Sequence, residues 1–148
     1  MRKTILLILS AVLFSATAYA YKGAVVYVPV YSHIYTGDQE KPFLLAVTIS
    51  IRNTDMKNRM TIMSADYYGS NGKLISRYIP KAVNLNPLSS VRFVVKESDT
   101  AGGSGASFIV RWKSSADVTD PVIESVMIGA KTQQGISFTS RGVVLSRD

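Results

Sequence analysis

The stretch Leu44-Leu-Ala-Val-Thr-Ile-Ser-Ile-Arg-Asn53 decides the fold of this chain. Every odd position from 45 to 51 is apolar: Leu45, Val47, Ile49 and Ile51. Polar side chains occupy three of the even positions between and after them: Thr48, Ser50 and Arg52. Because successive side chains of a strand point to opposite faces, this alternation predicts a strand with one buried and one solvated face, as in an antiparallel sheet.

The same two-residue period recurs along the rest of the chain. Val91, Phe93 and Val95 share one parity, and so do Phe108, Val110 and Trp112, which places Trp112 in the predicted core. A third segment is less regular, because Val122, Val126 and Ile128 share their parity with Glu124. Gly69-Ser-Asn-Gly72 separates two further strand-like segments, and Asn-Gly is a strong hairpin signal.

These short strands, with turn signals between them and no helical periodicity, indicate an all-β protein. We predict an immunoglobulin-like antiparallel β-sandwich of about seven to nine strands. A closed barrel is the alternative, because the spacing of strands does not distinguish the two architectures.

The first twenty residues have the order of a secretory signal peptide. Arg2 and Lys3 are followed by an apolar run from Ile5 to Phe14, and Ala18-Tyr-Ala20 supplies small residues for cleavage. We therefore expect a cleaved N-terminal signal helix (residues 1–20) and a single exported domain (residues 21–148), periplasmic or secreted. The mature part contains no second long apolar run, so we expect no membrane span in it.

The composition gives two further expectations. The chain has no cysteine, so the predicted domain must be stabilised without disulfides. Its formal net charge of +7 favours anionic partners in general, but the basic residues are scattered singly along the sequence. Nucleic-acid binding requires a clustered basic surface, so we predict no nucleic-acid partner.

The opening strand of the mature chain carries the first candidate site. Alternation places Val26, Val28, Val30 and Ile34 toward the core and the residues between them on the opposite face. That second face contains three tyrosines and the only histidine of the chain: Tyr27, Tyr31, His33 and Tyr35. Tyrosine rings suit stacking on sugars or docking of a partner, although ordinary packing under loops is the alternative. Pro29 indicates an edge strand or a bulge.

The second candidate is a loop rich in glycine: Gly102, Gly103, Ser104 and Gly105. Successive backbone N–H groups in such a loop can form an anion-binding concavity. Ser104 also suggests a nucleophile, but Ala106 stands where the nucleophile elbow requires glycine. A flexible connection between strands is the remaining interpretation.

Metal and cofactor chemistry is poorly supplied. His33 is the only nitrogen ligand of its kind, and no acidic pair has the spacing of a known calcium loop. We predict no metal site, no cofactor and no catalytic residue.

Five segments together resemble a bacterial family of exported proteins with a domain of unknown function. They are Tyr27-Val-Pro-Val-Tyr-Ser-His-Ile-Tyr35, Ser50-Ile-Arg-Asn-Thr-Asp55, Asp66-Tyr-Tyr-Gly-Ser-Asn-Gly-Lys-Leu-Ile75, Gly102-Gly-Ser-Gly-Ala-Ser-Phe-Ile-Val-Arg-Trp112 and Gln134-Gly-Ile-Ser-Phe-Thr-Ser-Arg-Gly142. The resemblance covers nearly all of residues 21–148 and implies a secreted single-domain protein. It brings no activity, substrate or site residue with it.

The sequence is most consistent with an exported, non-catalytic binding or accessory module of the cell envelope. Its partner is an unidentified protein or glycan, and the oligomeric state stays open. Two alternatives stay open as well. One is a serine-dependent hydrolase that uses Ser104, and the other is an envelope component that assembles with itself through an edge strand.

Overall fold

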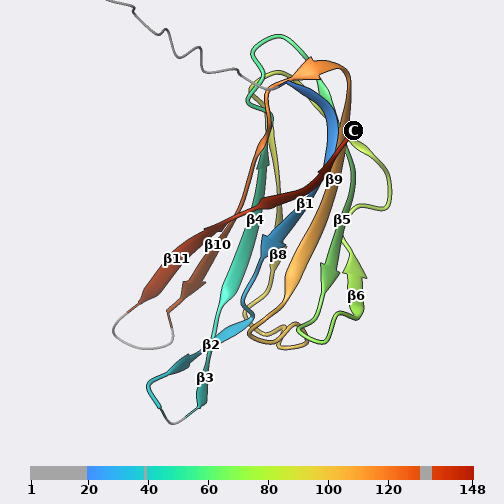
Figure 1. The fold of residues 1–148 in the computed structure, drawn as a ribbon. Coiled ribbons are helices and arrows are strands. Elements are labelled where there is room, and N and C mark those ends of the chain that lie inside the picture. Colours follow the sequence, from blue (N-terminus) through green and yellow to red (C-terminus); the bar gives the residue numbers. More distant parts are fainter. Residues whose placement is uncertain (1–19, 39, 131–134) are drawn as a thin grey trace, which may run out of the picture.

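Two antiparallel sheets stack face to face in the computed structural model, which describes residues 20–38, 40–130 and 135–148 (Figure 1). The larger sheet has the order β12-β1-β9-β5-β6, with β7 paired to β5. Its strands are β1 (Tyr21–Pro29), β5 (Met60–Tyr68), β6 (Leu74–Arg77), β7 (Val83–Leu85), β9 (Ser107–Val118) and β12 (Val143–Arg147).

The smaller sheet has the order β11-β10-β4-β8. Its strands are β4 (Ala46–Arg52), β8 (Ser90–Val95), β10 (Val122–Gly129) and β11 (Ile136–Arg141). A separate two-stranded ribbon consists of β2 (His33–Thr36) and β3 (Lys41–Leu44). The all-β sandwich is confirmed, but the described residues form twelve strands, more than predicted. The predicted signal helix lies outside the described residues, except for Ala20.

The core lies between the two sheets, where the alternation of β4 predicted it. Leu45, Val47, Ile49 and Ile51 are each at most 1% exposed. Phe108, Val110 and Trp112 of β9 are buried on the inner face of the opposite sheet, as expected. Full burial of one such side chain contributes about 1.5–3 kcal/mol. The packing of these two faces therefore stabilises a domain that contains no disulfide.

The buried side chains of β10 are at the odd positions, not at the even positions of Val122, Val126 and Ile128. Ile123, Ser125 and Met127 are buried, whereas Ile128 is exposed on the outer face. Ser125 is a polar residue in this inner row, and its hydroxyl donates a hydrogen bond of 2.6 Å to the carbonyl of Pro29 in β1. The two sheets are thus joined by a polar contact as well as by apolar packing.

The β5–β6 hairpin forms at the predicted Asn-Gly sequence, but with a different turn. Only Gly72 has a positive φ, of 75°, so the turn is not the type in which both Asn and Gly are left-handed. The N–H of Gly72 bonds the carbonyl of Gly69 at 2.9 Å, and Oδ1 of Asn71 accepts from the N–H of Lys73. Asn71 thus acts through its side chain rather than through its φ.

Asp55 fixes the loop between β4 and β5. Its Oδ1 accepts backbone hydrogen bonds from Lys57 at 2.8 Å and from Asn58 at 2.7 Å, and its Oδ2 accepts one from Thr119 at 3.3 Å. These bonds stabilise the charged carboxylate and hold the pKa of Asp55 below its usual value, the bond from Lys57 contributing most.

Asp55→Asn is expected to destabilise the protein at neutral pH and to matter less in acid. Because the folded pKa is lowered, the carboxylate stabilises the fold above its unfolded pKa of about 3.9, and this stabilisation is lost as the pH falls through the folded pKa. Urea unfolding at about pH 7 and about pH 3 measures the difference. Asp117→Asn, an exposed residue of β9, is the control. An equal loss for Asp55→Asn at both pH values would contradict the prediction.

Candidate functional site

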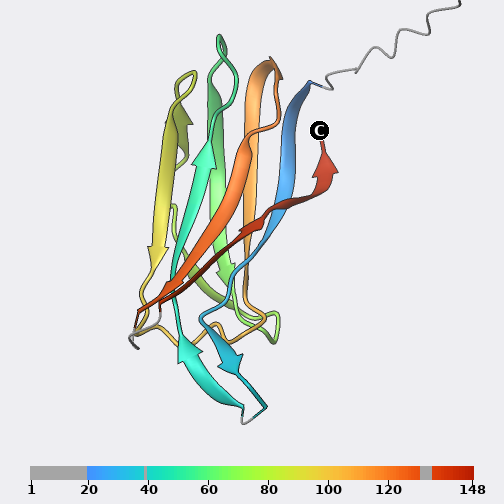
Figure 2. The same cartoon turned by 90° about the vertical axis from the view of Figure 1, so that its left-hand side faces the viewer.

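The β2–β3 hairpin projects beyond the end of the sandwich in both views (Figures 1 and 2). Its four pairs run from His33 opposite Leu44 to Thr36 opposite Lys41. Pro42 lies inside β3 and pairs with Tyr35. An isolated two-stranded ribbon is only marginally stable in water, so the hairpin depends on contacts at its root.

Aromatic side chains anchor that root to the small sheet. Tyr31 packs edge-to-face on Phe138 of β11, with ring centroids 5.6 Å apart. The ring of Phe43 in β3 occupies the space where a side chain at position 129 of β10 would lie. The ring fits there because Gly129 has no side chain. The N–H of Leu45 also bonds the carbonyl of Ser32 at 2.9 Å. The root of the hairpin is therefore fixed by both packing and backbone bonds.

Farther out, His33 and Tyr35 form a pair on one face of β2. Their ring centroids lie 5.3 Å apart at an interplanar angle of 79°, and His33 Nε2 is 3.4 Å from the Tyr35 hydroxyl. Tyr35 is 51% exposed, more than any other tyrosine of the described residues. The hairpin thus presents the Tyr35 ring to solvent, with the half-buried His33 ring packed beside it.

The four residues of the first candidate site do not share one strand, so their placement on a single face is wrong. Tyr27 lies in β1, opposite Ile109 of β9 and Val143 of β12, on the outer face of the larger sheet. Tyr31 is half-buried at the hairpin root. The chain leaves the larger sheet after Pro29, and the alternation that linked Tyr27 to His33 and Tyr35 does not continue through this break.

The prediction that Pro29 marks an edge strand is also wrong. β1 is an interior strand, paired with β12 on one side and β9 on the other. The last residue pair between β1 and β12 joins Tyr27 to Val143, and Pro29 lies beyond it. Pairing with β12 therefore requires no backbone N–H from Pro29. The register shifts of β1 fall elsewhere, between Val25 and Val26 against β12 and between Tyr21 and Gly23 against β9. The opening strand is therefore not a free edge for self-assembly.

The glycine-rich loop packs tightly against the β5–β6 turn. Ser70 Oγ donates to the Gly102 carbonyl at 2.8 Å and accepts from the Gly105 N–H at 2.9 Å. The Gly103 carbonyl accepts from the N–H of Ser32 at 3.1 Å, and Gly103 has a φ of 78°. The loop thus uses its carbonyls to join two other segments, and the Gly105 N–H is not free for an anion.

A buried hydroxyl pair lies under this loop. Ser32 Oγ and the Tyr67 hydroxyl are 2.9 Å apart, and burial raises the pKa of the Tyr67 phenol. A side chain at position 102 would clash with that phenol and lie 2.7 Å from Ser32 Oγ. The absence of a side chain at Gly102 is therefore a packing requirement.

Neither nucleophilic catalysis nor metal binding has an assembled centre in residues 20–38, 40–130 and 135–148. No hydrogen bond within these residues joins Ser104 to His33 or to a carboxylate, and His33 Nε2 faces Tyr35 instead. The same part of the chain contains no group of three or more potential metal ligands.

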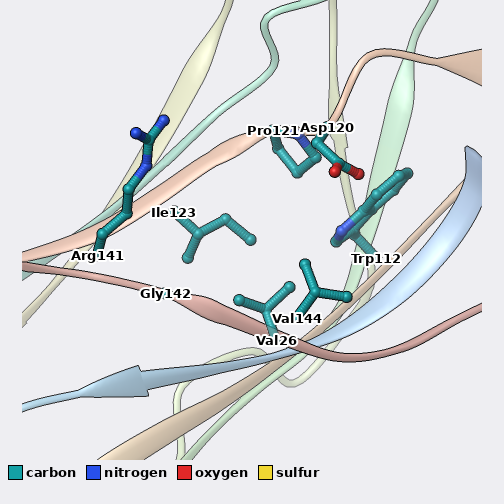
Figure 3. Close-up of a pocket in the computed structure, with 8 residues that line it drawn as sticks. All are labelled: Val26, Trp112, Asp120, Pro121, Ile123, Arg141, Gly142 and Val144. Atoms are coloured by element: carbon teal, nitrogen blue, oxygen red, sulfur yellow. The ribbon is translucent and has the colours of Figure 1, made fainter. Parts of the chain in front are cut away.

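A small hollow opens beside Trp112, between β1, β10 and β12 (Figure 3). Its volume is about 40 Å³, which holds a few water molecules and no organic ligand. The indole nitrogen of Trp112 and the carboxylate of Asp120 are its buried polar groups without a complete set of partners. We assign no binding role to it.

Fold and site together define a small β-sandwich domain with a projecting, aromatic hairpin. The chain belongs to the family of proteins of unknown function DUF3124, whose match covers residues 23–145. The resemblance to a family without known activity is thereby confirmed, whereas export stays a prediction.

The crystal structure of Thermotoga maritima 1070 is similar with a TM-score of 0.49 and 10% identity, over 84% of this chain and 94% of that one. No curated protein is significantly similar in sequence. Among the described residues, no helix has the length and apolar character needed to cross a membrane.

Gly102→Ala is expected to lower the free energy of unfolding by about 1–3 kcal/mol, because the new methyl group overpacks the Tyr67 and Ser32 hydroxyls. Gly105→Ala is the matched control in the same loop, since its nearest neighbour is Ser70 Oγ at 3.4 Å and it needs no positive φ. Thermal and urea unfolding of both variants measure the difference. Equal effects would show that the loop is loosely packed and would contradict this role of Gly102.

Proposed function

We propose that this protein is an exported, non-catalytic binding or accessory module of the cell envelope, and that it contacts a protein partner through the β2–β3 hairpin. The observation that carries the proposal is the exposed ring of Tyr35, packed on the half-buried His33, on a ribbon that projects beyond the sandwich (Figure 1). A protrusion with an exposed aromatic residue is typical of a recognition element, because the Tyr35 ring, unlike Phe43 at the root, is not buried against the core.

The shape of the hairpin favours a protein over a glycan. A projecting ribbon is convex, so its partner must offer a groove or pocket, as folded proteins do. Small ligands and sugars instead require a concave site on the binding protein. The anchored root fixes the orientation of Tyr35, which lowers the ordering cost on association.

The roles of Tyr35 and Tyr31 are separable by substitution. Tyr35→Ala is expected to weaken partner binding by about tenfold or more while the melting temperature stays nearly unchanged, because the ring is exposed. Tyr31→Ala is expected to lower the melting temperature by several degrees through loss of the Phe138 contact. A large loss of stability in Tyr35→Ala would make that ring structural instead.

A photo-crosslinking side chain at position 35, introduced in the full chain in its host cell, tests the contact directly. We expect adducts with one envelope protein from position 35 and none from position 94, since Val94 is similarly exposed but lies on β8 of the smaller sheet, outside the hairpin. Competition with envelope glycans distinguishes a sugar partner. Equal adducts from both positions, or none from position 35, would contradict the proposal.

A further inference from the structure

A second polar feature lies on the outer face of the larger sheet, at the end opposite the hairpin. It is an open hollow of about 440 Å³, lined by Arg59, Thr61, Asn84, Lys113, Ser114 and Ser115. We call these six residues the cationic hollow. Its volume lies in the range of small-molecule sites, about 300–1,000 Å³, and is far larger than that of the hollow beside Trp112.

Strand register brings the lining residues together from distant parts of the sequence. Thr61 of β5 lies opposite Lys113 of β9 on one side and opposite Asn84 of β7 on the other. Ile62 and Trp112, the neighbours of Thr61 and Lys113, are buried, so this row faces outward. Three strands thus contribute one row of an ammonium group, a hydroxyl and an amide.

The remaining wall is held by backbone contacts. Ser114 Oγ donates to the Arg59 carbonyl at 2.8 Å, and Ala116 N–H donates back to Ser114 Oγ at 3.2 Å. Arg59 directly follows the loop that Asp55 fixes through the N–H groups of Lys57 and Asn58. The backbone around Arg59 is therefore ordered, although its side chain is exposed.

The charge in the hollow is uncompensated within the described part of the chain. None of the six lining residues is acidic, and neither Arg59 nor Lys113 forms an ion pair with a described residue. Other arginines do have carboxylate partners: Arg52 with Glu124, Arg111 with Asp66 and Arg147 with Asp120. Two neighbouring cations without an anion favour an external negative group.

The other side chains fit the neutral part of such a ligand. Thr61 Oγ1 donates to Asn84 Oδ1 at 2.8 Å, which leaves the Asn84 amide hydrogens for an acceptor. Ser115 adds a hydroxyl. No aromatic ring lines the hollow, so it offers nothing on which a nucleobase would stack.

We infer that the cationic hollow binds the phosphate group of a small polyol or sugar ester, with Arg59 and Lys113 on the phosphate and Thr61, Asn84 and Ser115 on the hydroxyls. This site does not involve the β2–β3 hairpin, and the inference stands or falls independently of the proposed function.

An NMR titration of the full-length mature domain at low ionic strength tests the inference. The probes are inorganic phosphate, glycerol 3-phosphate and glycerol. We expect saturable shifts at the amides of Thr61, Lys113 and Ser114, tighter binding of glycerol 3-phosphate than of phosphate, and no shifts with glycerol. Shifts spread over all basic residues, or none at all, would overturn it.

Variants identify the groups responsible. Arg59→Gln and Lys113→Gln are each expected to weaken glycerol 3-phosphate binding by about tenfold, the loss of one charge-assisted hydrogen bond. Arg92→Gln, an exposed cation on β8 of the other sheet, is the matched control and is expected to bind as the wild type. An equal loss in Arg92→Gln would show attraction by overall charge only and would overturn the site.

Sedimentation with vesicles distinguishes a lipid headgroup from a soluble ester. Vesicles of phosphatidylglycerol and of phosphatidylcholine present the phosphate group at a surface. We expect glycerol 3-phosphate to bind in solution in the absence of both kinds of vesicle. Binding to phosphatidylglycerol vesicles that depends on Lys113, with no binding of glycerol 3-phosphate, would overturn the soluble ligand. Crosslinking at position 35 tests the hairpin contact alone, so its failure would leave the outcomes for the cationic hollow unchanged.

Discussion

Burial of one apolar face from each sheet is the constraint on which the structure depends. The chain has no cysteine and therefore no disulfide, and the packing between β4 and its facing strands stabilises the domain. Val47 and Ile49 from one sheet and Phe108 and Trp112 from the other are essentially inaccessible to solvent. Where alternation is strict, each strand has one possible face for the core, and a register shift of one residue is excluded.

Several buried polar groups of the described residues contact points where the chain changes course. Ser125 bonds the carbonyl of Pro29 at the end of β1, and Ser32 bonds the Tyr67 hydroxyl below the glycine-rich loop. At Gly142 the chain passes from β11 in one sheet to β12 in the other, and a side chain there would lie 2.7 Å from Val26. At these three places a hydrogen bond from a hydroxyl or the absence of a side chain accommodates the end of regular pairing in β1, below the glycine-rich loop and at Gly142.

Sequence alone predicted the sandwich and its main core residues, because a two-residue period needs no knowledge of neighbouring strands. It failed at the opening strand, because Pro29 and Val30 continue the apolar pattern although the chain leaves the sheet there. It also missed the cationic hollow. Arg59 and Lys113 are scattered in the sequence and become neighbours only through the pairing of Thr61 with Lys113, which periodicity does not specify. Phe43 and Gly129, which position the hairpin root, are likewise far apart in the sequence and become neighbours only in the folded chain.

The rigid sandwich explains how so short a ribbon can be an ordered surface. Four residue pairs cannot hold a hairpin in water by themselves. Here the Leu45 N–H bond to Ser32, the Phe43 ring over Gly129 and the Tyr31 contact with Phe138 fix its base to a buried framework. Order imposed at the root extends along β2 to His33 and Tyr35, because strand pairing restricts the backbone between them. A partner that binds these rings therefore meets a surface whose conformational entropy has largely been lost on folding, and more of the contact energy remains as affinity.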